Sequence, residues 1–554
     1  MKRFLRILKW GGIVLILLML GMAGTSEVII RWCVAPEPTM KGTPPILKEK
    51  VRTVGKRKIL GRSWLEKREG IWMLYLEGDP FTMGYSNGRL TYDLLGIQED
   101  EFLGTVVEKI PNALILRMVR TFVAYYNCSL HEHLTQEHKM MLYGLSLGAP
   151  RNHGYLGPVY NKYMNYHAAH DISHLIMDTP FVSASGCTGF AAWGDRTAQG
   201  HMISGRNFDF ETARSFDVHK VVAYMKPDKG IPFVTVGWSG FLGAVSGMNK
   251  AGLSISMYAG HASGRGGSGM PISLVARQVL QYAKDLKQAT DIICKAKVFV
   301  SDSFLIGSQK ERTFIVVEKS PAKCAVRKAK DKRILVANHF LSPVFANDPE
   351  VKKYKASGTS LARYQRIDTL TKRKHGLIDA AKSAKILRDR RGQGGKDVGL
   401  GNRSSLNALI ATHSVIFDMD LMRMWVSASP HQLGKFVAFD MHAFDKPLPK
   451  TTLPADPLFG KPYKQYKSFR KDLKRVSALL GKKKWKEALA LGKKLEPINP
   501  KYYELLDYIG QGYAGSGDVK KAVAYYRKAL AAQPAYPSER KQIERRLRAL
   551  KGTK

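Results

Sequence analysis

The stretch at 186–210 reads "GCTGFAAWGDRTAQGHMISGRNFDF" and decides how the chain is interpreted. Cys187 follows a glycine, and the apolar and small residues after it are typical of a β-strand. The residues near 195–200 predict a turn, and those from His201 onward predict a returning strand. A buried cysteine in a strand is usually just a small hydrophobic residue. The alternative is that Cys187 is a nucleophile that begins a new chain.

A catalytic thiol needs a base, a group that holds the base, and hydrogen-bond donors for an oxyanion. The chain has neither the Cys-Gly-Ser-Cys-Trp signature of papain-like enzymes nor an obvious histidine partner for Cys187. Scission of the bond before Cys187 would supply a base, because a free α-amino group has a pKa of about 8. Gly186 suits such a cut, since a residue without Cβ tolerates a strained backbone and lets the thiol reach its carbonyl.

This pattern resembles the start of the mature chain in cysteine N-terminal nucleophile (Ntn) hydrolases. It is most similar to the acyl-coenzyme A:6-aminopenicillanic acid acyltransferase family, with choloylglycine hydrolases, penicillin V acylases and acid ceramidases as more distant relatives. The similarity spans residues 70–445 and rests on a Cys-Thr pair, a strand hairpin and then "GRNFD". The resemblance implies an α+β fold, a four-layer αββα sandwich with two antiparallel sheets between helical layers.

The resemblance also implies roles for residues on this hairpin. Cys187 would be the nucleophile, and the Gly186–Cys187 bond would be the site of autocleavage. Asp209 would hold the freed α-ammonium group, and Arg206 would lie near the thiol and lower its pKa by its charge. Taken alone, Arg206 and Asp209 could equally form a surface ion pair.

Two further site residues follow from the same resemblance. Asn338 in "RILVANHFLSP" would be an oxyanion donor, and Arg363 in "SGTSLARYQRI" would be the second active-site arginine. The segment "SGMNKAGLSISMYAG" resembles a family hairpin that ends in asparagine in bile-salt hydrolases, whereas this chain has Tyr258–Ala259. The second oxyanion donor is therefore open and could be a backbone N–H.

Composition and charge set wider limits. The chain has 554 residues, which is too long for one compact domain. Hydrophobic residues make up 44% of it, which is enough for a sizeable core. A formal net charge of +42 indicates either an anionic partner or surface, or simply solvated lysines. No zinc-finger, RNA-binding or homeodomain signature is present, so we expect no nucleic-acid partner. Five cysteines leave at least one unpaired if the protein is exported.

The N-terminus predicts a membrane segment over residues 1–34. Four basic residues precede an apolar stretch from Trp10 to about Gly24, which places the bulk of the chain on the non-cytoplasmic side, periplasm or exterior in a bacterium. We favour an uncleaved anchor; secretion after signal cleavage is the alternative, because "GMAGTS" is a passable cleavage site.

Further along the chain, Pro, Lys and Gly predict a linker over 35–60, and residues 71–183 look largely helical. Together, 35–186 would form the linker and the propeptide or small subunit. The core would span 187–445, with strands at period two and helices at 271–296 and 376–390. A Pro-rich linker over 446–465 would then lead to a helical region at 466–554.

The last region fits tetratricopeptide repeats. In 509–534, "IGQGYAGSGDVKKAVAYYRKALAAQP", small and aromatic residues match the repeat pattern, and Ala488 and Pro500 lie 34 residues before Ala522 and Pro534. About two repeats and a capping helix at 536–550 are expected. Both a peptide-binding groove for a protein partner and a packing or dimerisation module remain open.

The sequence thus predicts an acyltransferase or amidohydrolase that acts through a Cys187 acyl-enzyme on an amide, ester or thioester. Its substrate would be an acylated small molecule or lipid. One alternative is a lipid-directed esterase or phospholipase-like member of the same superfamily. The other is a non-catalytic, membrane-tethered tetratricopeptide scaffold. The chemistry needs no metal or cofactor, so we interpret His167, His170 and His174 as a helix surface.

Overall fold

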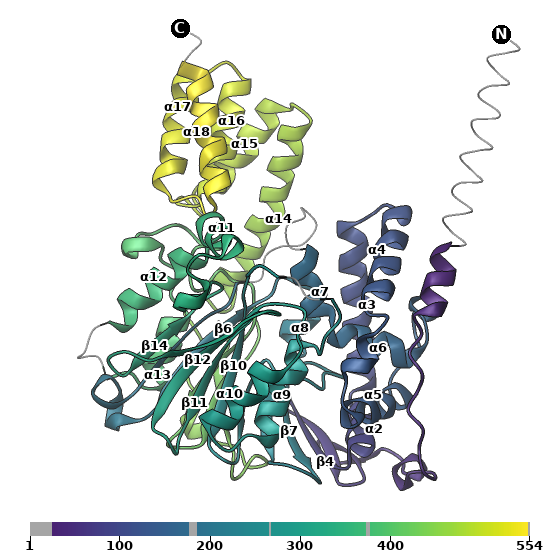
Figure 1. Ribbon diagram of the computed structural model, residues 1–554. Coiled ribbons are helices and arrows are strands. Elements are labelled where there is room, and N and C mark those ends of the chain that lie inside the picture. The colour runs from purple at the N-terminus through teal and green to yellow at the C-terminus, as the bar shows by residue number, and fades with distance from the viewer. Residues whose placement is uncertain (1–24, 177–185, 265–266, 373–376, 552–554) are drawn as a thin grey trace, which may run out of the picture.

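The computed structural model describes residues 25–176, 186–264, 267–372 and 377–551. In this part of the chain, two β-sheets form the centre of a mixed α+β fold (Figure 1). The larger sheet has eleven strands, in the order β1 (Arg52–Val54), β2 (Arg57–Leu60), β3 (Ser63–Arg68), β4 (Ile71–Gly78), β7 (Val221–Pro227), β8 (Phe233–Gly237), β9 (Ser246–Asn249), β10 (Leu253–Ala259), β11 (Asp302–Ser308), β12 (Thr313–Lys319) and β13 (Cys324–Lys328).

The smaller sheet carries most of the stretch at 186–210. Its six antiparallel strands run in the order β14 (Arg333–Val336), β5 (Thr188–Ala192), β6 (Ile203–Asp209), β15 (Ala411–Asp418), β16 (Arg423–Ser427) and β17 (Phe436–Asp440). The predicted hairpin is confirmed: β5 and β6 pair with Gly189 opposite Arg206, and short 3-10 turns at Gly194–Arg196 and Ala198–Gly200 join them.

The two sheets face each other, and helices cover their outer faces. Side chains alternate along β5 and β6, as expected for strands buried on both sides. Ala191 and Phe208 join the apolar cluster that also contains Val222 and Val234 of the larger sheet. Phe190 and Ile203 instead face α12 (Ser360–Thr371) and α13 (Ala380–Leu387). On the opposite side, α9 (Ile272–Tyr282) and α10 (Leu286–Lys295) contact the larger sheet.

The N-terminal region differs from the prediction in two respects. Its helices are α2 (Pro80–Leu90), α3 (Tyr92–Lys109), α4 (Ala113–Tyr126), α5 (Gln136–Gly148), α6 (Val159–His167) and α7 (Ala169–Ile176), which agrees with the helical pattern. However, the predicted linker contains β1 and β2, and β4 pairs in parallel with β7, with Trp72 opposite Val221. Because β4 is a short apolar run, periodicity alone could not separate strand from helix.

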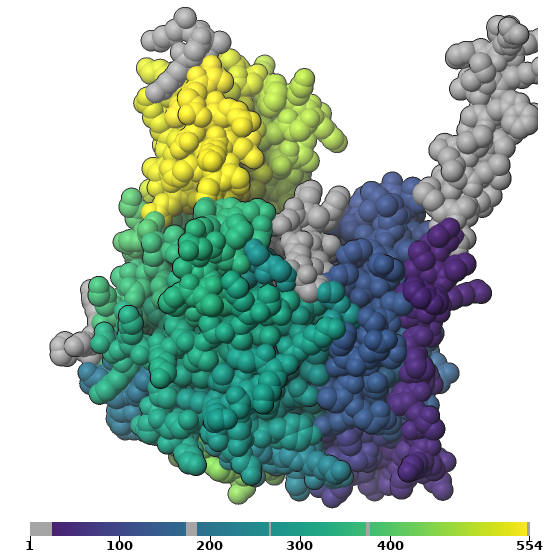
Figure 2. All heavy atoms as spheres, in the orientation of Figure 1, coloured from purple at the N-terminus to yellow at the C-terminus, as the bar shows by residue number. Residues whose placement is uncertain are grey.

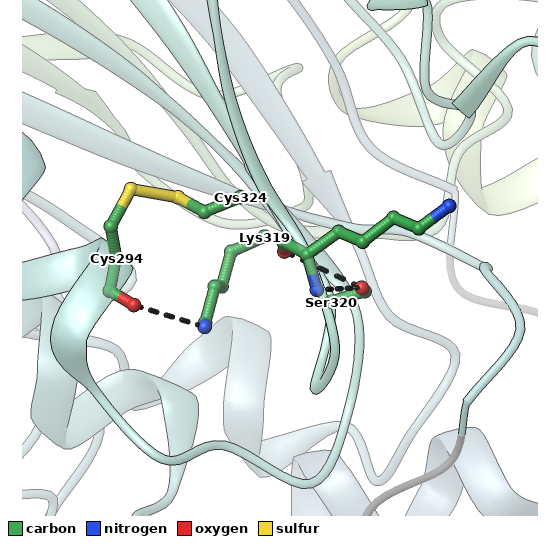
Figure 3. The surroundings of a disulfide bond; sticks show 5 residues. Cys294, Lys319, Ser320 and Cys324 are labelled. Atoms are coloured by element: carbon green, nitrogen blue, oxygen red, sulfur yellow. Dashed lines mark hydrogen bonds between the residues drawn. A yellow bond between two sulfur atoms is a disulfide. The ribbon is translucent and has the colours of Figure 1, made fainter. Parts of the chain in front are cut away.

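Four cysteines form two disulfides, Cys33–Cys128 and Cys294–Cys324, and Cys187 is the free one. The second disulfide ties α10 to β13, an edge strand that the sequence did not predict. Lys319 on β12 donates to the carbonyl oxygen of Cys294 at 3.1 Å beside this bridge (Figure 3). Neither disulfide crosses position 187.

The C-terminal helices pack largely on one another (Figure 1). They are α14 (Lys461–Gly481), α15 (Trp485–Leu495), α16 (Tyr503–Gly515), α17 (Val519–Ala531) and α18 (Pro537–Lys551). α15 and α17 begin 34 residues apart, and so do α16 and α18. The helical character is confirmed, while the assignment to tetratricopeptide repeats stays a prediction. The remaining helices, α8 (Ser215–Val218) and α11 (Pro349–Ser357), are short.

The membrane segment predicted over residues 1–34 falls mainly on residues outside the described ranges. Among the residues that the structure describes, no helix is both long and apolar enough to cross a bilayer. A helix over 25–32 begins the described part of the chain and leads to Cys33.

Candidate active site

Cys187 lies immediately before β5 and is 1% exposed. The half-buried Gly186 precedes it, and the backbone N–H of Gly186 donates to the carbonyl oxygen of Asp209 at 3.0 Å. This bond closes the open end of the β5–β6 hairpin. A Cβ on Gly186 would lie 3.5 Å from the Arg363 guanidinium and 3.7 Å from Cβ of Asp209. The predicted scission site therefore lies against two of the predicted site residues.

Arg206 is buried between the two sheets. Its Nη1 donates to the carbonyl oxygen of Val245 at 2.6 Å and to Oγ of Ser246 at 2.9 Å, and its Nη2 donates to the carbonyl oxygen of Met257 at 2.5 Å. Its guanidinium also lies 4.8 Å from the ring centre of Tyr258. These contacts fix a positive charge beside the thiol.

The pKa of the Cys187 thiol is nevertheless raised overall. Burial raises it most, and the nearby charge of Asp209 adds to this, while the charge and hydrogen bond of Arg206 and the charge of Arg363 act in the opposite direction. The expected effect of Arg206 is therefore present in direction, but desolvation of the thiolate exceeds it in this uncut chain.

Asp209 at the end of β6 is fully buried. Burial raises its pKa from 3.8 to about 7, although the charges of Arg363, Arg403 and Arg206 act to lower it. Its Oδ1 has no hydrogen-bond partner among the described residues. A buried carboxyl group with an unused acceptor beside Gly186 leaves room for a cationic donor.

Arg363 and Asn338 complete the cluster from outside the hairpin. Arg363 on α12 donates to the carbonyl oxygen of Cys187 at 2.6 Å and also to the hydroxyl group of Thr188. Its Nη2 donates to Oδ1 of Asn338 at 2.7 Å. Asn338 follows β14, the neighbour of β5, and its Nδ2 donates to the carbonyl oxygen of Ala259 at 2.9 Å. All five predicted catalytic residues thus meet around Cys187.

Tyr258, the point where the chain departs from bile-salt hydrolases, also reaches the cluster. Its hydroxyl group lies so close to Gly189 that a Cβ there would be 1.9 Å away. The sequence pointed to this position, although as a doubt about the second oxyanion donor. The close approach explains why residue 189 on β5 is glycine.

Arg403 is a neighbour that the sequence did not reveal. It forms an ion pair with Glu211 at 2.9 Å, and its charge lowers the pKa of Asp209. It lies in a loop between α13 and β15, and its neighbour Asn402 donates to the carbonyl oxygen of Gln533 at 3.1 Å. No local pattern could have found Arg403, because its place depends on how this loop packs against the C-terminal helices.

The interpretation of the three histidines as a helix surface is wrong for His167, whose side chain is buried. Nε2 of His167 accepts from the backbone N–H of Leu242 at 2.9 Å, and its Nδ1 lies 2.8 Å from the carbonyl oxygen of Tyr163. His170 lies beside Asp171, with 3.2 Å between Nδ1 and Oδ1. The side chain of His174 lies outside the described part of the structure.

Part of this chain is similar to a known protein family. Residues 196–428 match one family model. It is the model of acyl-coenzyme A:6-aminopenicillanic acid acyl-transferase. The stretch similar to this acyl-transferase family contains Arg206, Asp209, Asn338 and Arg363, while Cys187 lies just before it.

Two relatives extend the comparison. An uncharacterized protein of Archaeoglobus fulgidus is 28% identical over 395 residues, covering 64% of this chain and 63% of the relative. Protein dcd1A of Dictyostelium discoideum is 24% identical over 151 residues, covering 26% of this chain and 34% of the relative. The match thus spans less than two thirds of either relative.

Solved structures with some similarity include an N-acylethanolamine-hydrolyzing acid amidase orthologue of Caenorhabditis elegans. It is 14% identical, with a TM-score of 0.31, and the alignment covers 42% of this chain and 94% of that one. A conjugated bile acid hydrolase from Clostridium perfringens is also 14% identical, with a TM-score of 0.33, over 47% of this chain and 95% of that one.

Proposed function

We propose that this protein is a cysteine N-terminal nucleophile acyltransferase or amidohydrolase that activates itself by cutting the Gly186–Cys187 bond. The match to the acyl-transferase family supports acyl transfer or amide hydrolysis at the coarse level. The observation that carries the finer proposal is the position of Gly186. Its backbone N–H donates to the carbonyl oxygen of Asp209, whose buried carboxyl group has an unused Oδ1, and it lies beside the guanidinium of Arg363. A cysteine that served only as packing would need neither of these neighbours.

In the maturation step, the thiol of Cys187 attacks the carbonyl carbon of Gly186. The C–N bond breaks, the nitrogen of Cys187 takes the thiol proton, and a thioester joins residue 186 to Sγ. Water then hydrolyses this thioester and leaves a carboxylate on Gly186 and a free thiol on Cys187. The new α-amino group forms beside Asp209, whose unused Oδ1 can accept from it once the carboxyl group is ionised.

In turnover, the α-amino group serves as the base for the thiol of its own residue. The thiolate attacks the acyl carbon of an amide, ester or thioester, and the leaving group takes the proton from the α-ammonium group. Nδ2 of Asn338 has two hydrogens, of which one binds Ala259, so the other can donate to the oxyanion. Water or an acceptor nucleophile then attacks the thioester and frees Cys187.

After scission, the fragment that begins at Cys187 would stay associated with the fragment that ends at Gly186 through non-covalent contacts. Residues 1–186 would be the small subunit, and β4 of that subunit pairs with β7 of the rest over seven residues. The proposed location is outside the cytoplasm, anchored by residues 1–34. The two disulfides support this location, because disulfides persist mainly in oxidising compartments.

The test is to trap the acyl-enzyme. The full chain is mixed with N-acyl amides, acyl thioesters and phospholipid esters in separate reactions, quenched in acid and digested, and the peptide that begins at Cys187 is weighed. The proposal predicts an acyl adduct on that peptide with amides or thioesters. An adduct formed only with phospholipid would favour the lipid-directed esterase, and no adduct with any donor would favour the non-catalytic scaffold.

A further inference from the structure

A set of large apolar side chains is exposed on the N-terminal side of the molecule. Trp32 is 74% exposed, Met118 is 64% exposed and Tyr125 is 62% exposed. We call the whole set the α4 face; it consists of Val28 and Trp32 in the helix over 25–32 and Leu114, Ile115, Met118, Phe122 and Tyr125 of α4. Positions 115, 118, 122 and 125 follow helical spacing, so these side chains share one side of α4.

The α4 face belongs to a fixed part of the structure. Val123, on the opposite side of α4, packs on the main apolar cluster, and so does Tyr126, whose ring lies 5.7 Å from that of Phe122 at the edge of the α4 face. The disulfide Cys33–Cys128 ties the helix over 25–32 to the end of α4, and Arg120 pairs with Glu27 at 3.0 Å. The apolar side chains are therefore held outward by a covalently fastened pair of helices.

We propose that the α4 face lies in the interfacial region of a lipid bilayer. The 14 residues of α4 are too few to span a membrane, whereas an amphipathic helix of this kind can lie in the plane of the interface. The chain enters the described structure at Thr25, beside α4, and the sequence before it is the apolar stretch that begins at Trp10. In the sequence, this apolar stretch therefore leads directly into the helix over 25–32 that carries Val28 and Trp32.

Charge favours a lipid surface over a second copy of this chain. The formal net charge of +42 makes two copies repel each other, whereas the same charge is attracted to anionic lipid headgroups. The helix α14 carries many lysines and arginines and a single acidic residue, Asp472. The C-terminal helices and the α3–α4 pair project from the same side of the sheets, as Figures 1 and 2 show.

This inference goes beyond the proposed function and does not depend on scission at Cys187. If both hold, catalysis takes place on a protein held at a bilayer surface. A docking face without catalysis, or catalysis without docking, would separate the two claims.

The experiment places the full chain in nanodiscs that contain anionic phosphatidylglycerol and a phospholipid with a diazirine in its acyl chain. After irradiation, labelled residues are mapped by mass spectrometry. Val54 and Leu377, which are 59% and 63% exposed but lie elsewhere, are the matched controls. We expect Trp32, Met118 and Phe122 to be labelled about tenfold more than the controls, because an interfacial helix buries its apolar side among the lipids.

The proposal would be overturned if labelling were confined to residues before 25. It would also be overturned if the residues of the α4 face and the control residues were labelled equally. Cross-links between α4 of two chains in a mixture of heavy and light protein would overturn it too, because they would instead assign the face to a second copy.

A triple variant, Met118→Gln, Phe122→Gln and Tyr125→Gln, gives an independent readout. Its control is Val54→Gln, Val326→Gln and Leu377→Gln, which changes three exposed apolar residues elsewhere. We expect labelling of Trp32 to fall about tenfold in the first variant and to stay unchanged in the second, because the variant removes most of the apolar area that enters the interface. Equal labelling of Trp32 in both would contradict the proposal, and the mapping of the unmodified chain stands even if one variant does not fold.

Discussion

The guanidinium of Arg363 donates a hydrogen bond to the side-chain oxygen of Asn338, with 2.7 Å between Nη2 and Oδ1. The same guanidinium holds the carbonyl oxygen of Cys187. This pair of bonds fixes the Asn338 amide with its oxygen toward Arg363 and its Nδ2 hydrogens away from it. For the proposed role of Asn338 as an oxyanion donor, this orientation is set before any substrate binds.

Replacing Asn338 with Asp removes the donor while keeping the shape of the side chain. We expect kcat to fall by about 100-fold to 1,000-fold, as for the loss of one oxyanion donor. The exposed Asn347 provides the control, because Asn347→Asp changes charge in the same way on the surface. Steady-state kinetics on processed protein measures both, and a loss of less than tenfold in Asn338→Asp would remove Asn338 from the oxyanion site.

The raised pKa of Asp209 predicts a pH-dependent stability in the uncut variant Cys187→Ala. Between pH 3.8 and about 7 the folded state keeps the proton on Asp209 and the unfolded state does not. The free energy of unfolding therefore falls as pH rises through this range, by at most about 1.4 kcal/mol per pH unit. Adding Asp209→Asn should make this slope shallower, while other buried carboxyl groups with raised pKa values, such as Asp302 and Asp507, still contribute to it. Urea unfolding of both variants at several pH values measures it, and identical slopes would contradict the buried, protonated carboxyl group.

Arg403 predicts a shift in the pH dependence of self-cleavage. The ionised form of Asp209 is the one that can hold the new α-ammonium group, so cleavage should accelerate as pH rises through about 7. Because the charge of Arg403 lowers the pKa of Asp209, Arg403→Gln should move the midpoint to higher pH. The exposed Arg391 is the matched control. A time course of precursor loss at each pH gives the midpoints, and an unmoved or lowered midpoint would argue against Arg403 as a positioning residue.

Gly189→Ala tests the contact between β5 and Tyr258. A Cβ at 189 would lie 1.9 Å from the Tyr258 hydroxyl group, so the tyrosine or the strand must move. We expect a loss of about 1–3 kcal/mol in the free energy of unfolding and slower cleavage. Gly104→Ala in α3 has open space around it and should be neutral or slightly stabilising. Equal stabilities of the two variants would show that the site accommodates the added methyl group.

Much of the core could be predicted from local pattern. The strands β6 to β12 and β14 to β17 follow runs of apolar residues between Gly, Asn and Pro breaks, and the predicted helix over 271–296 appears as α9 and α10. The proximity of Arg206 and Asp209 to Cys187 could be predicted because all three belong to one hairpin, while their proposed roles came from the family resemblance. Asn338 and Arg363 needed the family resemblance, since α12 and the end of β14 reach the thiol only through the tertiary fold.

Other features could not be read from the sequence. β4 looks like the start of a helical region, and its partner β7 lies far along the chain, so no local signal marks it as a strand. β13 is half exposed and carries a mixed pattern, and the pairing of Cys294 with Cys324 depends on its position beside α10. Arg403 reaches Asp209 from a loop without regular structure.

The pairing of β4 with β7 predicts how the two fragments behave after scission. They should elute together on a sizing column under native conditions, since seven residue pairs and a shared apolar core join them. They should separate on a denaturing gel even without a reducing agent, because each disulfide joins two cysteines of the same fragment: Cys33–Cys128 in the smaller one and Cys294–Cys324 in the larger one. Fragments that separate only after reduction would contradict the disulfide pairing described above.

The most direct test of the central claim is the intact mass of the purified full chain under denaturing conditions, followed by sequencing of the newly formed N-terminus. The account predicts two polypeptides divided between Gly186 and Cys187, with Cys187 as the first residue of the larger one, and a single uncut chain for Cys187→Ala. An active wild-type protein that remains uncut at this bond would contradict it.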